Sequence, residues 1–371
     1  MLARLTRIFR PKRRRSLEAA GGGRRWDGFQ PLTAPSQSIL AARGPVLQRV
    51  RAAYVNHPVA HRVVEHLAAS LVGGSSWQAQ SQHPDPDTRR ALNSEFEDLV
   101  AGLMLPLARG LARDGEALVR LETSAAGVLS ARLLAPEQLD ASLHRELPDG
   151  GRITAGIEFD DDGEIVAYHI LPHAPDQPGP VGEAVRLPAG EVLHVFDPLF
   201  PGQVRGISPL SPVLLKLADY DAASDAMLMA LKIQSLMTGF ISDPEGGTAG
   251  FSGTAEGDAL NLSLEPGAMR VLPPGAEVEF SRPGDGLAQA ADFLKCQLRE
   301  IAAGAGLMFE HLSGDLSGTN YSSARFGLLE FRRRIEMLQR SLIERQFLRP
   351  LWQRWIAHKA LAGEIPLDEL A

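Results

Sequence analysis

Residues 314–339 read GDLSGTNYSSARFGLLEFRRRIEMLQ, and two unlike halves meet in this stretch. The first half is rich in glycine, serine and asparagine, which are typical of loops and turns. In the second half apolar residues recur every three or four positions, a spacing that predicts a long amphipathic helix. The members of this stripe are Leu328, Phe331, Ile335, Leu338 and Leu342, with Arg332, Arg333 and Arg334 on or near the polar face. Ser322 or Ser323 can cap the start of the helix.

The composition is that of an ordinary globular protein. The chain has 371 residues, of which 44% are hydrophobic and 22% are charged. Its single cysteine, Cys296, excludes an intramolecular disulfide and a cysteine-only zinc site, which favours a cytosolic setting. The chain has no run of 18 apolar residues, and its N-terminus lacks the apolar core of a secretory signal, so we expect no contact with a membrane.

The formal charge is unevenly distributed. Residues 1–25 hold nine basic residues and one acidic residue, whereas the whole chain has a net charge of −7. A basic arm on an acidic body can attach to nucleic acid or to an acidic protein surface, while the body itself repels DNA. The arm candidates are Arg10, Lys12, Arg13, Arg14 and Arg15. We expect residues 1–44 to be largely disordered, either as a solvated tail or as an electrostatic anchor. A mitochondrial-type presequence is a third interpretation.

Residues 45–208 show the pattern of an α+β domain. Helical periodicity runs through 45–73 and restarts at Pro58, strand-like residues follow at 115–123, and alternation continues through 130–200. Asp160 to Gly163 lie between two strand-like runs and predict a hairpin turn. The stretch superficially resembles a calcium-binding loop, but the later ligands of such a loop are missing. The histidines at 57, 61 and 66 lack a carboxylate or cysteine to complete a metal site, so we expect a helix face and no metal.

Two long helices are predicted at 209–239 and 286–306, the first with Ser208 as its cap. Between them, residues 240–285 are rich in glycine and proline, with short strand-like runs at 268–272 and 277–281. Cys296 lies on the second helix, where we interpret it as a small packing residue. Residues 348–371 predict a short helical end.

The sequence offers no convincing catalytic constellation. It has no P-loop, no dinucleotide fingerprint and no nucleophile elbow. His311, Ser313 and Asp315 are close together in sequence, but sequence proximity is not triad geometry. We therefore expect a protein that is not an enzyme and has no cofactor, and we keep an enzyme built on these three residues as a rival hypothesis.

Three stretches resemble the lambda-type portal proteins of tailed bacteriophages. They are YVNHPVAHRVVEHLAASLVGG (54–74), the segment from EVLHVFDPLF to SLMTGFI (191–241) and LSGDLSGTNYSSARFGLLEFRRRIEMLQ (312–339). The likeness spans roughly residues 40–350. The chain is short for this family, which is consistent with a compact siphophage, a prophage remnant or a gene transfer agent.

The resemblance implies a fold and a set of regions. It makes 1–44 the arm, 45–208 a wing α+β domain, 209–239 and 286–306 two stem helices, 240–285 a small clip, 307–321 a tunnel loop, 322–347 a long helix and 348–371 a short crown. The implied residues at the DNA channel are Ser313, Gly314, Asp315, Ser317, Gly318, Thr319, Asn320 and Tyr321, with Ser322, Ser323 and Arg325 at the junction with the helix. Asp315 either faces the bore or caps a turn, and the turn is favoured. The helical stripe is expected to pack between subunits or on the wing, or else within one subunit.

The resemblance also implies partners. The family forms rings of twelve subunits at one capsid vertex of the virion, made in the cytoplasm of the bacterial host. Double-stranded DNA would pass without sequence readout, and the terminase large subunit, the head–tail adaptor and the major capsid protein would bind. A rival of another class is a protein that grips DNA through residues 1–25, which predicts salt-sensitive binding by the monomer.

Overall fold

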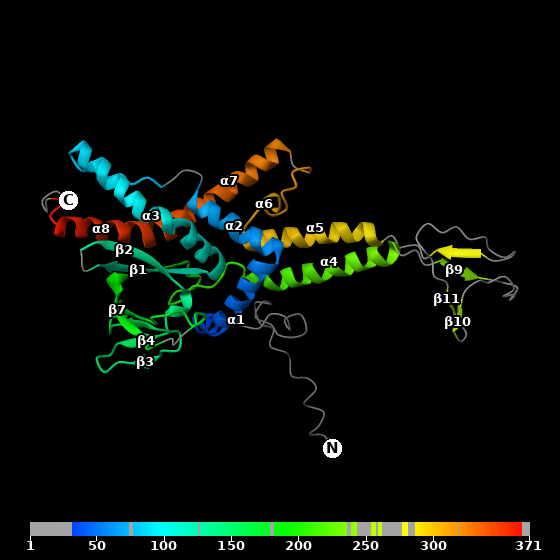
Figure 1. The fold of residues 1–371 in the computed structure, drawn as a ribbon, viewed down its shortest axis with the longest axis horizontal. Coiled ribbons are helices and arrows are strands. Elements are labelled where there is room, and N and C mark those ends of the chain that lie inside the picture. The colour runs from blue at the N-terminus through cyan, green and yellow to red at the C-terminus, as the bar shows by residue number, and fades with distance from the viewer. Residues whose placement is uncertain are drawn as a thin grey trace, which may run out of the picture.

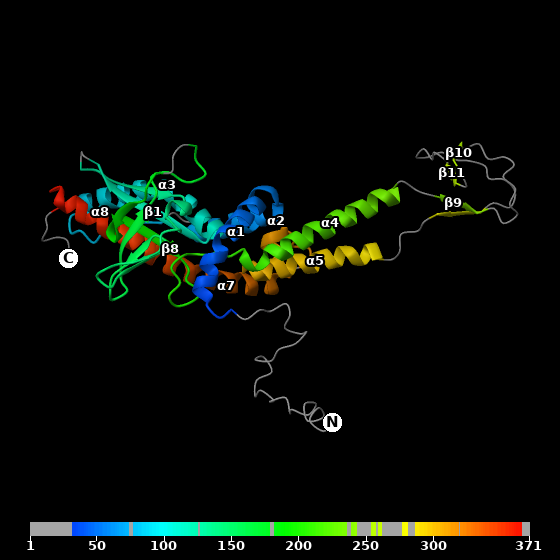
Figure 2. The same cartoon turned by 90° about the horizontal axis from the view of Figure 1, so that it is seen from below.

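The structure is a computed structural model that describes residues 32–73, 77–124, 127–178, 182–235, 239–242, 254–256, 259–261, 277–280, 286–318 and 320–365. A body of mixed helices and sheets carries a projecting pair of helices, α4 (Leu214–Ser235) and α5 (Gly286–Ala305), which lie alongside each other in Figures 1 and 2. Short strands lie beyond the pair: β9 (Gly239–Ser242) pairs with β12 (Glu277–Phe280), and β10 (Thr254–Glu256) pairs with β11 (Ala259–Asn261). The run 268–272 falls outside the described residues.

The body is built on helices from both ends of the chain. They are α1 (Pro35–Asn56), α2 (Pro58–Val72), α3 (Pro86–Asp114), α6 (Phe309–Ser313), α7 (Tyr321–Leu338) and α8 (Arg349–Leu361). A π-helical segment, Gln339–Leu348, joins α7 to α8. One hydrophobic core contains residues of α2, α3, α5, α7 and α8, so the C-terminal helices pack on the N-terminal ones.

Two antiparallel sheets complete the body. The first has the order β2-β1-β8, with β1 (Glu116–Thr123) between β2 (Leu129–Leu134) and β8 (Val192–Phe196). The second is a five-stranded meander of β3 (Arg145–Glu146), β4 (Arg152–Thr154), β5 (Ile157–Phe159), β6 (Ile165–Ile170) and β7 (Val185–Pro188). The predicted hairpin turn is confirmed: Gly163 has φ +86°, and its N–H donates to the Asp160 carbonyl at 3.2 Å.

A buried charge cluster joins α1, the first sheet and the segment that leads into α4. Glu116 is fully buried and accepts hydrogen bonds from Arg43 at 2.7 Å and from Arg205 at 2.6 Å. The Gly206 N–H donates to the same carboxylate at 2.7 Å, and His194 Nε2 lies 3.2 Å from it. Burial opposes ionisation of Glu116, but the charges of Arg205 and Arg43 outweigh it and hold its pKa well below the usual range.

The structure corrects one predicted boundary and shows how the C-terminal helix packs. The arm does not extend to residue 44, because α1 begins at Pro35 and continues through Pro45, with Ile39 buried and Arg43 paired to Glu116. Residues 349–361 form α8, the short helical end that the sequence predicts. The ring centroids of Trp352 and Trp355 lie 4.9 and 5.6 Å from that of Phe96 on α3, so α8 belongs to the body.

The predicted apolar stripe of α7 is buried within the chain. Ile335 and Leu342 are 6% and 5% exposed, and Phe331 packs against the same core. Leu328, at the N-terminal end of the stripe, is 39% exposed. The interpretation of Cys296 as a packing residue is wrong, because Cys296 is exposed. It lies on the side of α5 opposite to the buried Ile301, which faces the core.

The predicted helix starts need small changes. The helix α7 begins at Tyr321, so Ser322 stands inside its first turn and does not precede it. The helix α4 begins at Leu214 after a short 3₁₀ turn at Ser211–Val213, and the Ser208 hydroxyl accepts a hydrogen bond from the Leu210 N–H at 3.2 Å. In the part of the chain that the structure describes, no helix combines the length and apolarity that a membrane crossing requires.

Candidate functional site: the loop before the long helix

The loop predicted at 307–321 leaves α5 through a tight turn. Gly306 has φ +71°, a conformation that favours glycine, and its N–H donates to the Ala303 carbonyl at 3.0 Å. The guanidinium of Arg334 lies over this turn and donates to the Ala305 carbonyl at 3.4 Å. The segment then forms the short helix α6, an element that the sequence did not predict.

Aromatic rings and one arginine anchor α6 to the body. The ring centroid of His311 lies 4.4 Å from that of His66 on α2 and 4.5 Å from that of Phe331 on α7. The Arg62 Nε–H donates to the His311 carbonyl at 2.9 Å. Leu312 is buried, and the Arg299 guanidinium lies 5.0 Å from the ring centroid of Phe309. The base of the loop is therefore held by α2, α5 and α7 together.

Both histidines are held neutral. Burial, the neighbouring His311 and Arg62 lower the pKa of His66 from 6.5 to about 4, and burial also lowers the pKa of His311. His66 Nε2 and His311 Nδ1 are buried and have no hydrogen-bond partner among the described residues. Protonation would therefore place charge on buried nitrogens that have no hydrogen-bond partner in this part of the structure, and Glu310, which favours the charged form of His311, does not outweigh the burial.

We predict that acid loosens the base of the loop. Because the folded pKa of His66 is depressed, the unfolded chain takes up its proton first, and stability falls as the pH drops below about 6.5 toward 4. Amide hydrogen exchange in residues 309–313, corrected for intrinsic rates, should be faster at pH 5 than at pH 7. The variant His66→Phe keeps a ring but cannot be protonated, so it should lose most of this response. Equal protection at both pH values in the unaltered chain would contradict the prediction.

The tip of the loop is polar and makes its own turns. Gly314 has φ +70°, and its N–H donates to the Glu310 carbonyl at 2.9 Å. Asp315 Oδ1 accepts hydrogen bonds from the Ser317 hydroxyl at 2.6 Å and from its N–H at 2.9 Å. These two bonds hold the pKa of Asp315 below its ordinary value. The structure thus supports the interpretation of Asp315 as a turn residue.

The predicted channel residues cluster at this tip, apart from those outside the described part. Exposed members are Ser313, Gly314, Ser317, Gly318, Asn320, Tyr321, Ser322 and Arg325, and Tyr321 is 79% exposed. Thr319, the side chain of Ser323, and the arm residues Arg10, Lys12, Arg13, Arg14 and Arg15 lie outside the described residues. Leu316 was not among the predicted channel residues, and its side chain is 67% exposed between the polar residues.

The geometry does not form the catalytic set that the sequence left open. Ser313 Oγ donates to the Phe309 carbonyl at 2.9 Å, Asp315 is engaged by Ser317, and the His311 ring is stacked in the anchor. Within the described ranges, no group of three or more histidine, cysteine, aspartate or glutamate residues is placed to hold a metal ion. The arrangement suits passive contact through hydroxyl, amide and backbone N–H groups.

Comparison with known proteins identifies the family. The family model for phage portal proteins of the lambda family matches residues 22–339, which include most of the body, the helix pair and the loop. The chain belongs to the lambda family of phage portal proteins. Portal proteins of this family are in general structural and not catalytic.

Individual relatives are distant. The probable portal protein of Halomonas phage phiHAP-1 is 25% identical over an alignment that covers 99% of this chain and 75% of that protein. Portal protein B of Escherichia phage lambda is 26% identical over 52% of this chain and 41% of its own length. This lambda-family chain therefore aligns with less than half of the lambda protein.

Two solved structures match most of this chain at low sequence identity. A chain in the neck of a native GTA particle, computed with C12 symmetry, covers 92% of this chain at 16% identity and a TM-score of 0.49; 84% of that chain is matched. An HK97-family portal protein from Corynebacterium diphtheriae covers 85% of this chain at 14% identity and a TM-score of 0.37; 98% of that chain is matched.

Proposed function

We propose that this chain forms the portal ring at one capsid vertex of a virion or virion-like particle, through which double-stranded DNA enters during packaging and later leaves. The family match over residues 22–339 is the observation that carries this proposal. The ring is proposed to have twelve copies. With one helix from each copy lining the bore, twelve helices spaced about 10 Å apart form a circle about 38 Å across, and one helix diameter of about 10 Å leaves a bore near 28 Å. A duplex about 20 Å wide passes through such a bore.

The loop at 314–320 is the proposed contact with the moving duplex. Its tip is polar and exposed, whereas its base is fixed through His311 and Leu312. Hydroxyl and backbone N–H groups can touch phosphates without reading sequence. A continuous basic lining would bind DNA through counterion release and retard it, so a loop with few charges suits a conduit.

The remaining partners follow from this role. The short strands beyond α4 and α5 would meet the terminase large subunit during packaging and the head–tail adaptor afterwards. ATP hydrolysis would belong to the terminase, and this chain would have no catalytic activity and no cofactor. The basic arm, with nine basic residues in 1–25, would contact the major capsid protein or the outside of the ring.

Particle production without this chain tests the proposal. Particles assembled from a genome or gene cluster that lacks the gene should contain little or no nuclease-protected DNA, and complementation with the intact gene should restore it. Normal amounts of protected DNA without the chain would contradict the conduit role. If the arm alone were responsible, a peptide of residues 1–25 would restore protected DNA.

A further inference from the structure

The helix α4 exposes more apolar surface than is expected of a helix whose packing partners are all present. Leu215 is 81% exposed, Met229 is 58% exposed and Leu228 is 50% exposed, although α5 already covers another side of the helix. On α5, Phe293 is 54% exposed. A helix that is apolar around most of its circumference is normally buried on several sides. The projecting pair therefore needs further partners.

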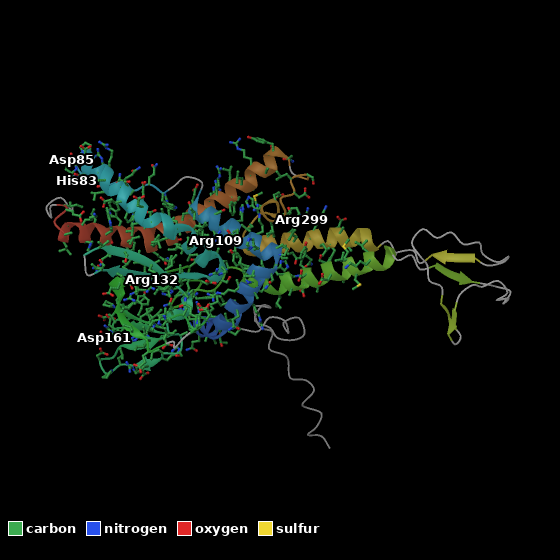
Figure 3. All side chains as sticks on the ribbon, in the orientation of Figure 1. His83, Asp85, Arg109, Arg132, Asp161 and Arg299 are labelled. Carbon is green, nitrogen blue, oxygen red and sulfur yellow. The ribbon has the colours of Figure 1, made fainter. Side chains whose placement is uncertain are left out.

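The outer faces of the two helices differ in charge. On α4, Asp219 and Asp225 are exposed beside the small residues at 218, 222 and 226. On α5, Lys295 and Arg299 are exposed on either side of Cys296. Figure 3 places Arg299 on the side of α5 that faces α6, consistent with its contact to Phe309. One outer face is acidic and the other is basic near the body.

Other charges near these groups do not remove the contrast. Lys216 on α4 is already paired with Glu300 on α5 at 3.0 Å within the chain. Asp221 lies 3.8 Å from His57, and Lys295 is near enough to Asp315 to influence its pKa. A further acid, Asp292, is exposed on α5 toward the short strands, so complementarity is confined to the end next to the body.

The opposite charges on the two outer faces also lie at matching positions along the helix axes. The ion pair of Lys216 with Glu300 sets a common level for the two antiparallel helices. We measure positions from that level along the helices, away from the body, at about 1.5 Å per residue. Asp219 on α4 then lies at about 4.5 Å. On α5, Arg299 lies at about 1.5 Å and Lys295 at about 7.5 Å, so Asp219 is between them. Rotation about an axis along the pair keeps these levels, so a neighbouring copy presents its cations at the height of Asp219.

We propose that the outer face of α4 in one copy packs against the outer face of α5 in the next copy, with Asp219 between Lys295 and Arg299 of that copy. This inference rests on the proposed ring. The contact is heterologous: two different faces meet, and repetition around the axis closes the ring. It covers Leu215 and Met229, which lie on the same side of α4 as Ala218 and Ala222, and it gives the ring a fixed direction through charge complementarity.

The native cysteine provides a direct test. Along the helices, Cys296 lies about 6 Å from the level of the Lys216–Glu300 ion pair, which is between the levels of Ala218 and Ala222. Full-length Ala218→Cys and Ala222→Cys variants, oxidised as purified rings, should give a ladder of covalent multimers on a non-reducing gel. Adding Cys296→Ser should abolish the ladder. A cysteine at Leu361, which is 82% exposed on α8, should give none with Cys296.

Charge reversal gives a second, independent readout. Asp219→Lys should lower the fraction of chain in rings about tenfold or more, because like charges then face each other. Adding Lys295→Glu and Arg299→Glu should restore most of it.

Intact rings with no ladder from either cysteine variant, or an unchanged ring fraction in Asp219→Lys, would overturn the contact. Intact rings with altered DNA retention in the charge variants would place the α5 cations against the duplex and also overturn it. An unaltered chain that forms no ring would instead refute the proposed function.

Discussion

Replacing residues 314–320 with a short glycine linker is expected to leave rings intact and to reduce nuclease-protected DNA per particle about tenfold. The tip contributes little to the fold, because its hydrogen bonds are mostly local, such as those of Ser317 to Asp315. The anchor formed by His66, His311 and Phe331 stays in place. Removing the tip therefore removes the polar contact with the duplex and not the scaffold.

Two controls separate contact from folding in this experiment. Quantitative DNA measurement in purified particles should be paired with microscopy of the rings, which should be unchanged. A variant that keeps the loop length but replaces Leu316 with serine should package nearly normally, since the proposed contacts are polar. Full DNA content in the loop-replaced particles would show that residues 314–320 do not act on DNA.

Substitution of Glu116 by alanine is expected to cost about 3–5 kcal/mol of stability, because it leaves two buried guanidinium groups without their counter-charge. Arg205 is 1% exposed and also donates to the carbonyls of Pro136 and Leu139, so it cannot reach water without breaking these bonds. The cluster also fixes the chain just before α4. Loss of Glu116 should therefore disturb the attachment of the helix pair to the body.

Unfolding measurements under matched conditions check this prediction. Glu116→Gln keeps the side-chain volume and one acceptor, so it should fold even if the alanine variant does not, with a smaller but clear loss of stability. The matched control is Glu330→Ala, which breaks an exposed ion pair with Arg333 and should cost less than about 1 kcal/mol. Loss of stability in Glu116→Gln no larger than in Glu330→Ala would show that the cluster is not a stabilising centre.

Much of the fold was predictable because its elements have strong local patterns. The strand at 116–123, the Asp-Gly turn at Gly163 and the helices on either side of the short strands follow from periodicity and turn chemistry. The start of α1 was not predictable, because the local preferences of Gly44 and Pro45 indicate a break in the helix. A distant contact, Arg43 to Glu116, stabilises the helix there instead.

The candidate site was predictable as a loop but not as an anchored one. Its exposed polar tip follows directly from composition. The contact of Arg62 with His311 joins residues separated by 249 positions, and no local pattern signals it. The exposure of Cys296 was missed for a related reason, since a helical pattern at 286–306 indicates that one side is buried but does not define how far burial extends around the helix.

The particle formed by the purified full-length chain tests the central claim most directly. Native mass spectrometry and negative-stain microscopy should show a closed ring with a central hole; twelve copies of 40.0 kDa give a mass of about 480 kDa. A stable monomer that binds duplex DNA through its basic N-terminal arm, with affinity falling steeply as salt rises, would contradict the account.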